Sequence, residues 1–453
     1  MRTTIEKLIY GGDGLARVDS AAVFVPFVIP GEDLELQITE QKKKFQRGEV
    51  TNLLVPSPNR VQPLCPYFTR CGGCQYQHIS YEAQLKYKEE ILRETIRRTG
   101  GMVWEQPIIV HSSPPWRYRN RAQWKIRPAN DSPDAVPAIG YMRAASSALC
   151  AVDQCPIISP LLESTLVSFS QWLDARDDFA AQVAQIREVE AFADHADEHF
   201  TLTLQFSQWP RDPQNFADAL HERLPHVVSL LFRNKSGEYA TGFGSGALEY
   251  HAADTNYQVS HDSFFQVNRF LVDTLVQRVA LAAGTGQIAL DLFAGAGLFT
   301  VPLAKNFQRV ISVESNPAAV QDLRANVAQD AANGPADAAP VRKDSCSSRP
   351  TAARVEPRQT DVTQFLRKPL REVSEADVVV IDPPRTGIPP EALPRLFKLK
   401  PRRIIYVSCD PSTLARDLAV FHTNHYSMAA LELFDHFPQT FHIESLAVLE
   451  RDP

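Results

Sequence analysis

Apolar and polar positions alternate in short runs over the first sixty residues. The apolar runs lie at Ile5–Ile9, Leu15–Val18, Val23–Val28 and Leu34–Ile38. Glycine, aspartate and proline separate them, and Pro56-Ser57-Pro58 follows as a linker. Closely spaced strands with turn residues between them are typical of a small β-barrel, which we predict for residues 1–62.

The pattern takes a helical period after residue 80. Leu85, Ile91, Leu92 and Ile96 share one face of a helix predicted over residues 81–98. A mixed, β-rich stretch follows to about residue 255, and a second helix is predicted over residues 266–283. We therefore expect residues 63–255 to form a mixed α+β central domain.

Buried strands and helices alternate from residue 256 to residue 453. Apolar strands are predicted at residues 289–292, 310–313 and 377–381, and each ends at a glycine turn or a carboxylate. This alternation predicts a Rossmann-like, doubly wound α/β domain. Residues 328–358 are rich in Ala, Pro, Asp and Ser, so we expect a disordered insertion there, with Cys346 as a bystander.

Composition narrows the class of protein. The chain has 453 residues, 44% hydrophobic and 22% charged, which is ordinary for a soluble globular protein. No apolar run approaches the roughly 20 residues that span a bilayer, and the N-terminus lacks the apolar segment of a signal peptide. We expect a cytoplasmic protein without a membrane or an obligate protein partner. Its seven cysteines then indicate metal binding or catalysis before disulfides.

The net charge of -6 argues weakly against nucleic acid, but it hides local patches. Residues 117–127 interleave arginines with aromatic residues and contain no acid. Such a surface can stack on unpaired bases and contact phosphates, so Arg119 and Arg121 are candidate RNA contacts. A solvated edge strand explains the same stretch equally well.

A glycine turn follows the first strand of the α/β domain. Gly295 and Gly297 let the backbone approach a ligand, and Glu314, ending the next strand, can bind ribose hydroxyls. The fingerprint of dinucleotide sites has a later glycine, whereas Leu298 follows Gly297 directly. The turn therefore favours S-adenosylmethionine (SAM) over a dinucleotide, although a generic Rossmann-type unit stays open.

Three cysteines lie close together near the N-terminus. Cys65, Cys71 and Cys74 fall within ten residues, and Cys155 is favoured over Cys150 as a fourth ligand. Four thiolates suit zinc or an iron–sulfur cluster. The three-plus-one layout favours a [4Fe-4S] cluster, and four protein ligands would close it, which indicates a structural role.

A seventh cysteine stands apart from this group. Cys409 directly follows a strand of the α/β domain, in the run Tyr406-Val407-Ser408-Cys409-Asp410-Pro411. A thiol beside a predicted cofactor site indicates covalent catalysis.

These motifs together resemble one family. They are Cys65…Cys71-Gly72-Gly73-Cys74, Phe264-Phe265-Gln266-Val267-Asn268, Asp382-Pro383-Pro384-Arg385, Ser408-Cys409-Asp410 and the run from Phe434 to Glu444. The chain resembles the SAM-dependent RNA uracil-5-methyltransferases over nearly its whole length, and most closely their iron–sulfur, 23S ribosomal RNA branch. The first domain is similar to a TRAM domain.

The resemblance implies a role for each residue. Cys409 would be the nucleophile that attacks uracil C6, and Glu444 the base that removes the C5 proton. The implied SAM site comprises Gln266, Phe293, Glu314, Asp361 and Asp382, next to Gly295. Either Phe264 or Phe265 would stack on the target base, while the other packs in the core. Asp410 and Leu298 depart from the family pattern, which usually has Asn and often a polar residue there.

Three other functions stay open. The same chemistry could act on transfer RNA, or the chain could be a non-catalytic RNA-binding protein of ribosome assembly. Cytosine-5 methylation also uses a thiolate, but typically from a Pro-Cys pair, and here Ser408 precedes Cys409. Intact Cys409 and Glu444 favour an active uracil enzyme.

Overall fold

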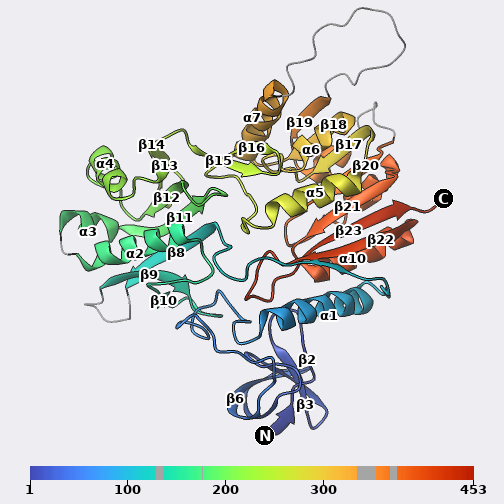
Figure 1. Cartoon of the computed structure of the whole chain (residues 1–453), viewed down its shortest axis with the longest axis horizontal. Helices are drawn as coiled ribbons and strands as arrows, with labels where there is room; N and C mark the ends of the chain where they lie inside the picture. Colours follow the sequence, from blue (N-terminus) through green and yellow to red (C-terminus); the bar gives the residue numbers. More distant parts are fainter. Residues whose placement is uncertain (129–135, 176, 334–352, 368–374) are drawn as a thin grey trace, which may run out of the picture.

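The computed structural model describes residues 1–128, 136–175, 177–333, 353–367 and 375–453 (Figure 1). Three β-sheets and one β-hairpin organise this part of the chain. The N-terminal barrel lies below helix α1 (Tyr81–Thr99), and the central and C-terminal sheets lie above it, on opposite sides of the molecule (Figure 1).

The barrel is a six-stranded sheet in the order β1-β5-β6-β4-β3-β2. Its strands are β1 (Arg2–Thr4), β2 (Lys7–Leu8), β3 (Gly14–Val18), β4 (Ala21–Val25), β5 (Asp33–Gln41) and β6 (Gln46–Val55). Alternate positions such as Val23, Val25, Leu34 and Leu36 fill its interior. Strand β6 was not predicted, because most of its side chains are exposed and its apolar residues do not alternate.

The central sheet has seven strands in the order β10-β9-β8-β11-β12-β13-β14. They are β8 (Arg121–Pro128), β9 (Pro137–Met142), β10 (Leu149–Ala151), β11 (Ile186–Ala193), β12 (Phe200–Phe206), β13 (Val227–Arg233) and β14 (Tyr239–Phe243). The chain forms three helices between these strands: α2 (Pro160–Asp174), α3 (Asp178–Val183) and α4 (Pro213–Arg223). Trp124, Phe169 and Phe206 are fully buried in the core of this unit.

The C-terminal sheet has eight strands in the order β19-β18-β17-β20-β21-β23-β22-β7. They are β7 (Ile109–His111), β17 (Gly286–Leu292), β18 (Phe307–Glu314), β19 (Arg354–Gln359), β20 (Val378–Ile381), β21 (Arg403–Ser408), β22 (Tyr426–Phe434) and β23 (Glu444–Arg451). Strands β17 to β21 run parallel, whereas β23 is antiparallel to both β21 and β22. After β17 the chain builds β18 and β19 on one side of it and then β20 on the other side. The boundary between β17 and β20 is therefore the topological switch point, where sheets of this kind bind ligands.

The helices of this unit are α5 (Val272–Ala283), α6 (Thr300–Ala304), α7 (Pro317–Asn333), α8 (Val362–Arg367), α9 (Leu393–Leu396), the 3₁₀ turn η1 (Phe397–Leu399) and α10 (Pro411–Thr423). The hairpin of β15 (Ala247–Ala252) and β16 (Thr255–Ser260) packs against α7. Helix α1 packs against α10 and shares its apolar core.

Three sequence predictions need correction. The helix predicted over residues 266–283 begins only at Val272, because residues 266–271 form a loop, most of which is buried. The predicted insertion is ordered at both ends: residues 328–333 belong to α7, and residues 354–359 form β19. Its middle, including Cys346, lies outside the described residues. Within the range predicted as one central domain, β7 joins the C-terminal sheet instead.

The helices that the structure describes include none with the length and hydrophobicity of a membrane span.

Candidate active site

Strand pairing brings Cys409 and Glu444 to the same edge of the C-terminal sheet. Cys409 directly follows β21, and Glu444 is the first residue of β23, which runs in the opposite direction. Ser408 pairs with Ser445, and the Ser445 hydroxyl donates to the Ser408 carbonyl at 3.3 Å. Two residues separated in the chain by all of α10 and β22 therefore become neighbours at the ends of adjacent strands.

A third acidic residue joins them from β20. Asp382 directly follows this strand, and its backbone N–H donates to the carbonyl of Leu292 at the end of β17 at 3.3 Å. The side chain thus lies at the switch point of the sheet, where the parallel strands end. Cys409, Glu444 and Asp382 occupy one ligand-binding edge.

Burial dominates the electrostatics of this group. It raises the pKa of the Cys409 thiol to about 12, with further increases from the charges of Glu444 and Asp382, while Arg385 lowers it. Burial and the Asp382 charge also raise the pKa of Glu444, again opposed by Arg385. Like charges near one another resist ionising together, and carboxyl and thiol groups with raised pKa values are typical of catalytic sites.

The glycine turn after β17 leaves room for a ligand. Gly295 has a φ of +53°, and a Cβ built there would meet no atom within 4 Å. Its N–H donates to Oε2 of Glu314 at 3.0 Å, and Oε1 accepts from the N–H groups of Ser315 and Asn316 at 2.7 Å each. Glu314 is therefore fixed at the end of β18, beside an open backbone turn.

The other residues predicted for the cofactor have different surroundings. Phe293, next to the turn, has a φ of +66° and packs partly against the core. Gln266 is buried in the loop before α5. Asp361 accepts a hydrogen bond from the Gln364 N–H at 2.8 Å, which places it at the start of α8 as an N-cap.

The comparison with known families decides the class of enzyme. A model described as tRNA (Uracil-5-)-methyltransferase matches residues 80–452. A model of the TRAM domain of tRNA (uracil(54)-C(5))-methyltransferase matches residues 1–58.

The chain belongs to the RNA uracil-5-methyltransferase family.

Individual relatives agree with this assignment. An uncharacterised RNA methyltransferase of Aquifex aeolicus is 31% identical, and the alignment covers 99% of this chain and 98% of the relative. The 23S rRNA (uracil(1939)-C(5))-methyltransferase RlmD of Shewanella sp. ANA-3 is 30% identical over 99% and 95% of the two chains. The protein is thus a SAM-dependent RNA methyltransferase, which sets aside a non-catalytic role.

A solved structure shows the same fold. The tRNA (uracil-54, C5)-methyltransferase of Pyrococcus abyssi, in complex with S-adenosyl-L-homocysteine, has a TM-score of 0.70 and 24% identity. The match covers 99% of this chain and all of that one. The mixed α/β methyltransferase fold with its N-terminal TRAM domain is therefore confirmed.

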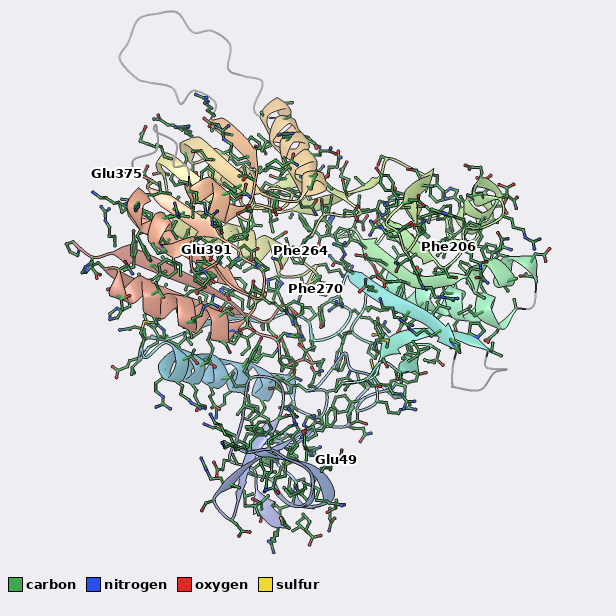
Figure 2. The ribbon with its side chains drawn as sticks, turned by 180° about the vertical axis from the view of Figure 1, so that it is seen from behind. Glu49, Phe206, Phe264, Phe270, Glu375 and Glu391 are labelled. Atoms are coloured by element: carbon green, nitrogen blue, oxygen red, sulfur yellow. The ribbon has the colours of Figure 1, made fainter. Side chains whose placement is uncertain are left out.

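The two phenylalanines of this methyltransferase have different surroundings. Phe265 is buried and packs on Tyr250 and Tyr257, with ring centroids at 4.8 Å and 5.8 Å. Phe264 is 65% exposed and lies between the central and C-terminal units (Figure 2). Of the pair, only Phe264 exposes its ring at the surface.

The two arginines predicted to contact RNA are engaged within the protein. Arg121 donates to Glu190 at 2.8 Å and to the carbonyls of Ser263 and His261 at 2.9 Å and 3.3 Å. Arg119 donates to the carbonyl of Arg121 at 2.8 Å. Arg121 therefore braces the segment before Phe264, a role that the alternation of charges and rings could not reveal.

The predicted cluster cysteines gather against the central sheet. Cys71, Cys74 and Cys155 border one apolar core, which also contains Cys150. Besides burial, the charges of Cys155 and Cys65 raise the pKa values of both Cys71 and Cys74, and the charge of Cys150 raises those of Cys65 and Cys71. Among the described side chains, no three His, Cys, Asp or Glu are arranged to hold a single metal ion.

Two residues of the site were not predicted from the sequence. Arg385 is the cation that faces Cys409 and Glu444, and its place in the run Asp382-Pro383-Pro384-Arg385 could have drawn attention to it. Tyr10 of the barrel donates to Asp410 at 3.1 Å. No local pattern signals this contact, because it joins opposite ends of the chain.

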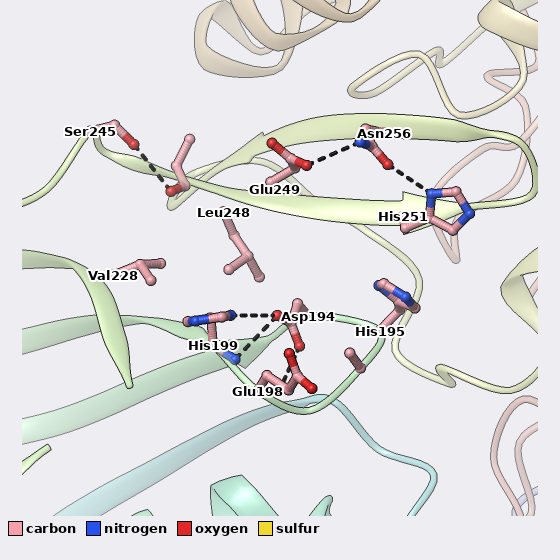
Figure 3. A pocket seen from close by; sticks show the side chains of 12 residues that line it. Asp194, His195, Glu198, His199, Val228, Ser245, Leu248, Glu249, His251 and Asn256 are labelled. Carbon is pink, nitrogen blue, oxygen red and sulfur yellow. Dashed lines mark hydrogen bonds and ion pairs between the residues drawn. The ribbon is translucent and has the colours of Figure 1, made fainter. Parts of the chain in front are cut away.

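A separate pocket opens between the β11–β12 turn and the β15–β16 hairpin (Figure 3). Its volume is about 580 Å³, and His195, His199 and His251 line it together with acidic residues. None of the predicted catalytic, cofactor or cysteine residues lines this pocket.

Proposed function

We propose that this enzyme methylates C5 of a specific uridine through a covalent bond between Cys409 and C6 of the base. The observation that carries the proposal is the Ser408–Ser445 pairing, which sets a thiol and a buried carboxyl side by side at the ligand-binding edge. Uracil C5 is a poor nucleophile, and addition of a thiolate at C6 makes it reactive.

The reaction then balances in three steps. The Cys409 thiol loses its proton to solvent, and its sulfur bonds to C6 while the C5–C6 double bond opens to an enolate. C5 takes the methyl group of SAM, and the rest of SAM leaves as S-adenosylhomocysteine. Glu444 accepts the C5 proton, the C6–sulfur bond breaks, and the double bond and the thiolate are restored.

The surroundings of Glu444 suit the last step. Burial and the neighbouring Asp382 raise its pKa, so once ionised it is a stronger base than an exposed carboxylate. Asp382 would orient the uracil edge or the amino group of SAM. Gln266, Phe293, Gly295, Glu314 and Asp361 would hold the rest of SAM, with Glu314 on its ribose.

Substitution of the two proposed catalytic residues separates their roles. Cys409→Ala should bind SAM normally and form no denaturation-resistant complex with RNA. Glu444→Gln should accumulate a methylated covalent adduct, because bond formation proceeds without C5 deprotonation. Gel electrophoresis under denaturing conditions and mass spectrometry of the adduct measure both outcomes. An adduct in Cys409→Ala would remove the thiol from the mechanism.

We infer that the substrate is 23S ribosomal RNA. Two relatives of about 30% identity that align over 99% of this chain are named as 23S rRNA methyltransferases. The family description and the solved neighbour name transfer RNA, which is the competing substrate. Mapping 5-methyluridine in both RNAs from a strain that lacks this gene distinguishes them, since only the true substrate loses the modification.

We also propose that Cys65, Cys71, Cys74 and Cys155 hold a [4Fe-4S] cluster. Cys71, Cys74 and Cys155 border one apolar core, and Cys65 lies within electrostatic range of Cys71 and Cys74. The three-plus-one spacing of these cysteines along the chain favours a cluster of irons and sulfides over zinc. The cluster would link the loop of residues 65–74 to the strand region near Cys155, which is a structural task.

Anaerobic purification tests the cluster. The protein should contain iron and acid-labile sulfide in equal amounts and absorb visible light. Cys74→Ser should lose both signals, while the matched control Cys150→Ser, a buried cysteine of the same core, should keep them. Stoichiometric zinc without sulfide would contradict the proposal.

A further inference from the structure

A tyrosine of the barrel reaches the loop that carries Cys409. Tyr10 follows β2, and its hydroxyl donates to Oδ2 of Asp410 at 3.1 Å. The two residues are 400 positions apart in the chain. The contact therefore exists only because the barrel is docked against the catalytic sheet.

Asp410 is held from its other side by a helix. As the N-cap of α10, its Oδ1 accepts from the N–H groups of Ser412 and Thr413 at 2.8 Å and 3.0 Å. A carboxylate suits this double contact, because both of its oxygens accept hydrogen bonds, whereas an asparagine amide offers one acceptor. The residue after Cys409 is thus clamped between the helix and the barrel.

The same barrel turn also touches the loop that leads to Glu444. The Tyr10 ring packs edge-on against Phe441, with centroids 5.6 Å apart and planes at 83°. Gly12 has a φ of +97°, and a Cβ there would lie 3.3 Å from the Phe441 ring. One turn of the barrel therefore borders the loops of both proposed catalytic residues.

We propose that Tyr10 is a positioning residue of the methyltransferase, which holds the Cys409 loop in the geometry that attacks C6. The barrel is then part of the active-site wall as well as an RNA-binding module. This inference rests on the proposed role of Cys409 as the nucleophile.

The test measures the rate of covalent adduct formation by the full-length protein. The probe is a mixture of 23S ribosomal and transfer RNA transcripts that contain 5-fluorouridine, supplied with SAM. Tyr10→Phe keeps the ring on Phe441 and removes only the hydroxyl. Its adduct rate should fall about tenfold, the effect of losing a hydrogen bond to a charged group, with RNA affinity and thermal midpoint unchanged.

Two further variants isolate the contact. Tyr239→Phe removes the hydroxyl of an exposed tyrosine on β14 and should react like the unaltered protein. In an Asp410→Ala background the hydroxyl has lost its partner, so adding Tyr10→Phe should cause no further fall.

Each remaining outcome overturns a stated claim. An unchanged rate in Tyr10→Phe, an equal fall in the Asp410→Ala background, or a fall explained by weaker RNA binding overturns the positioning role while the catalytic proposal stands. If the unaltered protein forms no adduct with either RNA, the proposed function fails first and takes the role of Tyr10 with it.

Discussion

Arg385 supplies the positive charge of an otherwise acidic site. It lowers the pKa values of Cys409 and Glu444, against the larger effect of burial. Its Nη2 lies 3.3 Å from Nδ1 of His442, whose pKa falls to about 3 because it is buried and faces this cation. His442 is therefore neutral at physiological pH and leaves the charge of Arg385 available to the thiol.

Removing this charge should make Cys409 less reactive. In Arg385→Leu the pKa of the Cys409 thiol rises further, because the cation that lowers it is gone, so the thiolate fraction at any given pH falls. Alkylation of Cys409 by iodoacetamide should slow about three- to tenfold at pH 9, and Arg385→Lys, which keeps the charge, should lose less. Mass spectrometry of the Cys409 peptide measures the rate. Equal rates in the two variants would exclude a charge effect.

At the scale of elements, α1 secures the loop that precedes β23. Lys88 is fully buried on α1, and its Nζ lies 2.5 Å from Oδ1 of Asp435 and donates to the Phe437 carbonyl at 3.0 Å. Gln84, one turn earlier, exchanges hydrogen bonds with the Gln439 side chain and N–H. The motif from Phe434 to Glu444 is thus held in place by a helix that lies more than three hundred residues earlier in the chain.

Breaking the ion pair between Lys88 and Asp435 should lower the stability of the fold. Lys88→Met leaves the Asp435 carboxylate buried without its cation and should cost about 3–5 kcal/mol in the free energy of unfolding. Adding Asp435→Asn removes the stranded charge and should recover part of the loss. Urea denaturation of the single and double variants measures both. The exposed pair Lys86–Glu90 on the same helix provides the control, since Lys86→Met should change little.

How much could be predicted depended on whether the signal was local. The strands before Gly295, Asp382 and Cys409 carried continuous apolar runs, and parallel sheets place such strand ends at one edge, so that edge could be predicted. The start of α5 could not, because the buried loop at Gln266 is as apolar as a helix. The engagement of Arg121 by Glu190 and the reach of Tyr10 depend on long-range packing, which leaves no periodic pattern.

At the scale of the whole molecule, the barrel is joined to the rest by a buried carboxylate. Glu32, in the turn before β5, accepts from the N–H groups of Ile29 and Ser57 at 2.8 Å and 3.2 Å. Arg60, beyond the linker, donates to both oxygens of Glu32 at 2.6 Å and 2.7 Å. Leu8 and Ile29 of the barrel pack into the core shared with α1. These contacts hold the barrel in the position in which Tyr10 reaches Asp410.

This junction should depend on pH in a defined direction. Burial raises the pKa of Glu32, but the hydrogen bonds from Arg60, Ile29 and Ser57 outweigh it, so the pKa lies below its ordinary value. A carboxyl with a lowered folded-state pKa stabilises the fold above its unfolded value and loses that contribution as the pH falls through the folded one. The barrel amides should therefore be protected from hydrogen exchange at neutral pH, and this protection should weaken only below about pH 4.

In Arg60→Ala the protection should already be weak at pH 7, because the ionised Glu32 is then buried without its cation. Hydrogen exchange of the amides of residues 1–55, corrected for the intrinsic rate at each pH, measures the protection. Arg17→Ala breaks an exposed pair with Glu6 on the same barrel and should leave the profile unchanged. If Arg60→Ala keeps the protection of the unaltered protein at pH 7, the ion pair does not dock the barrel, and the apolar contacts of Leu8 and Ile29 hold it alone.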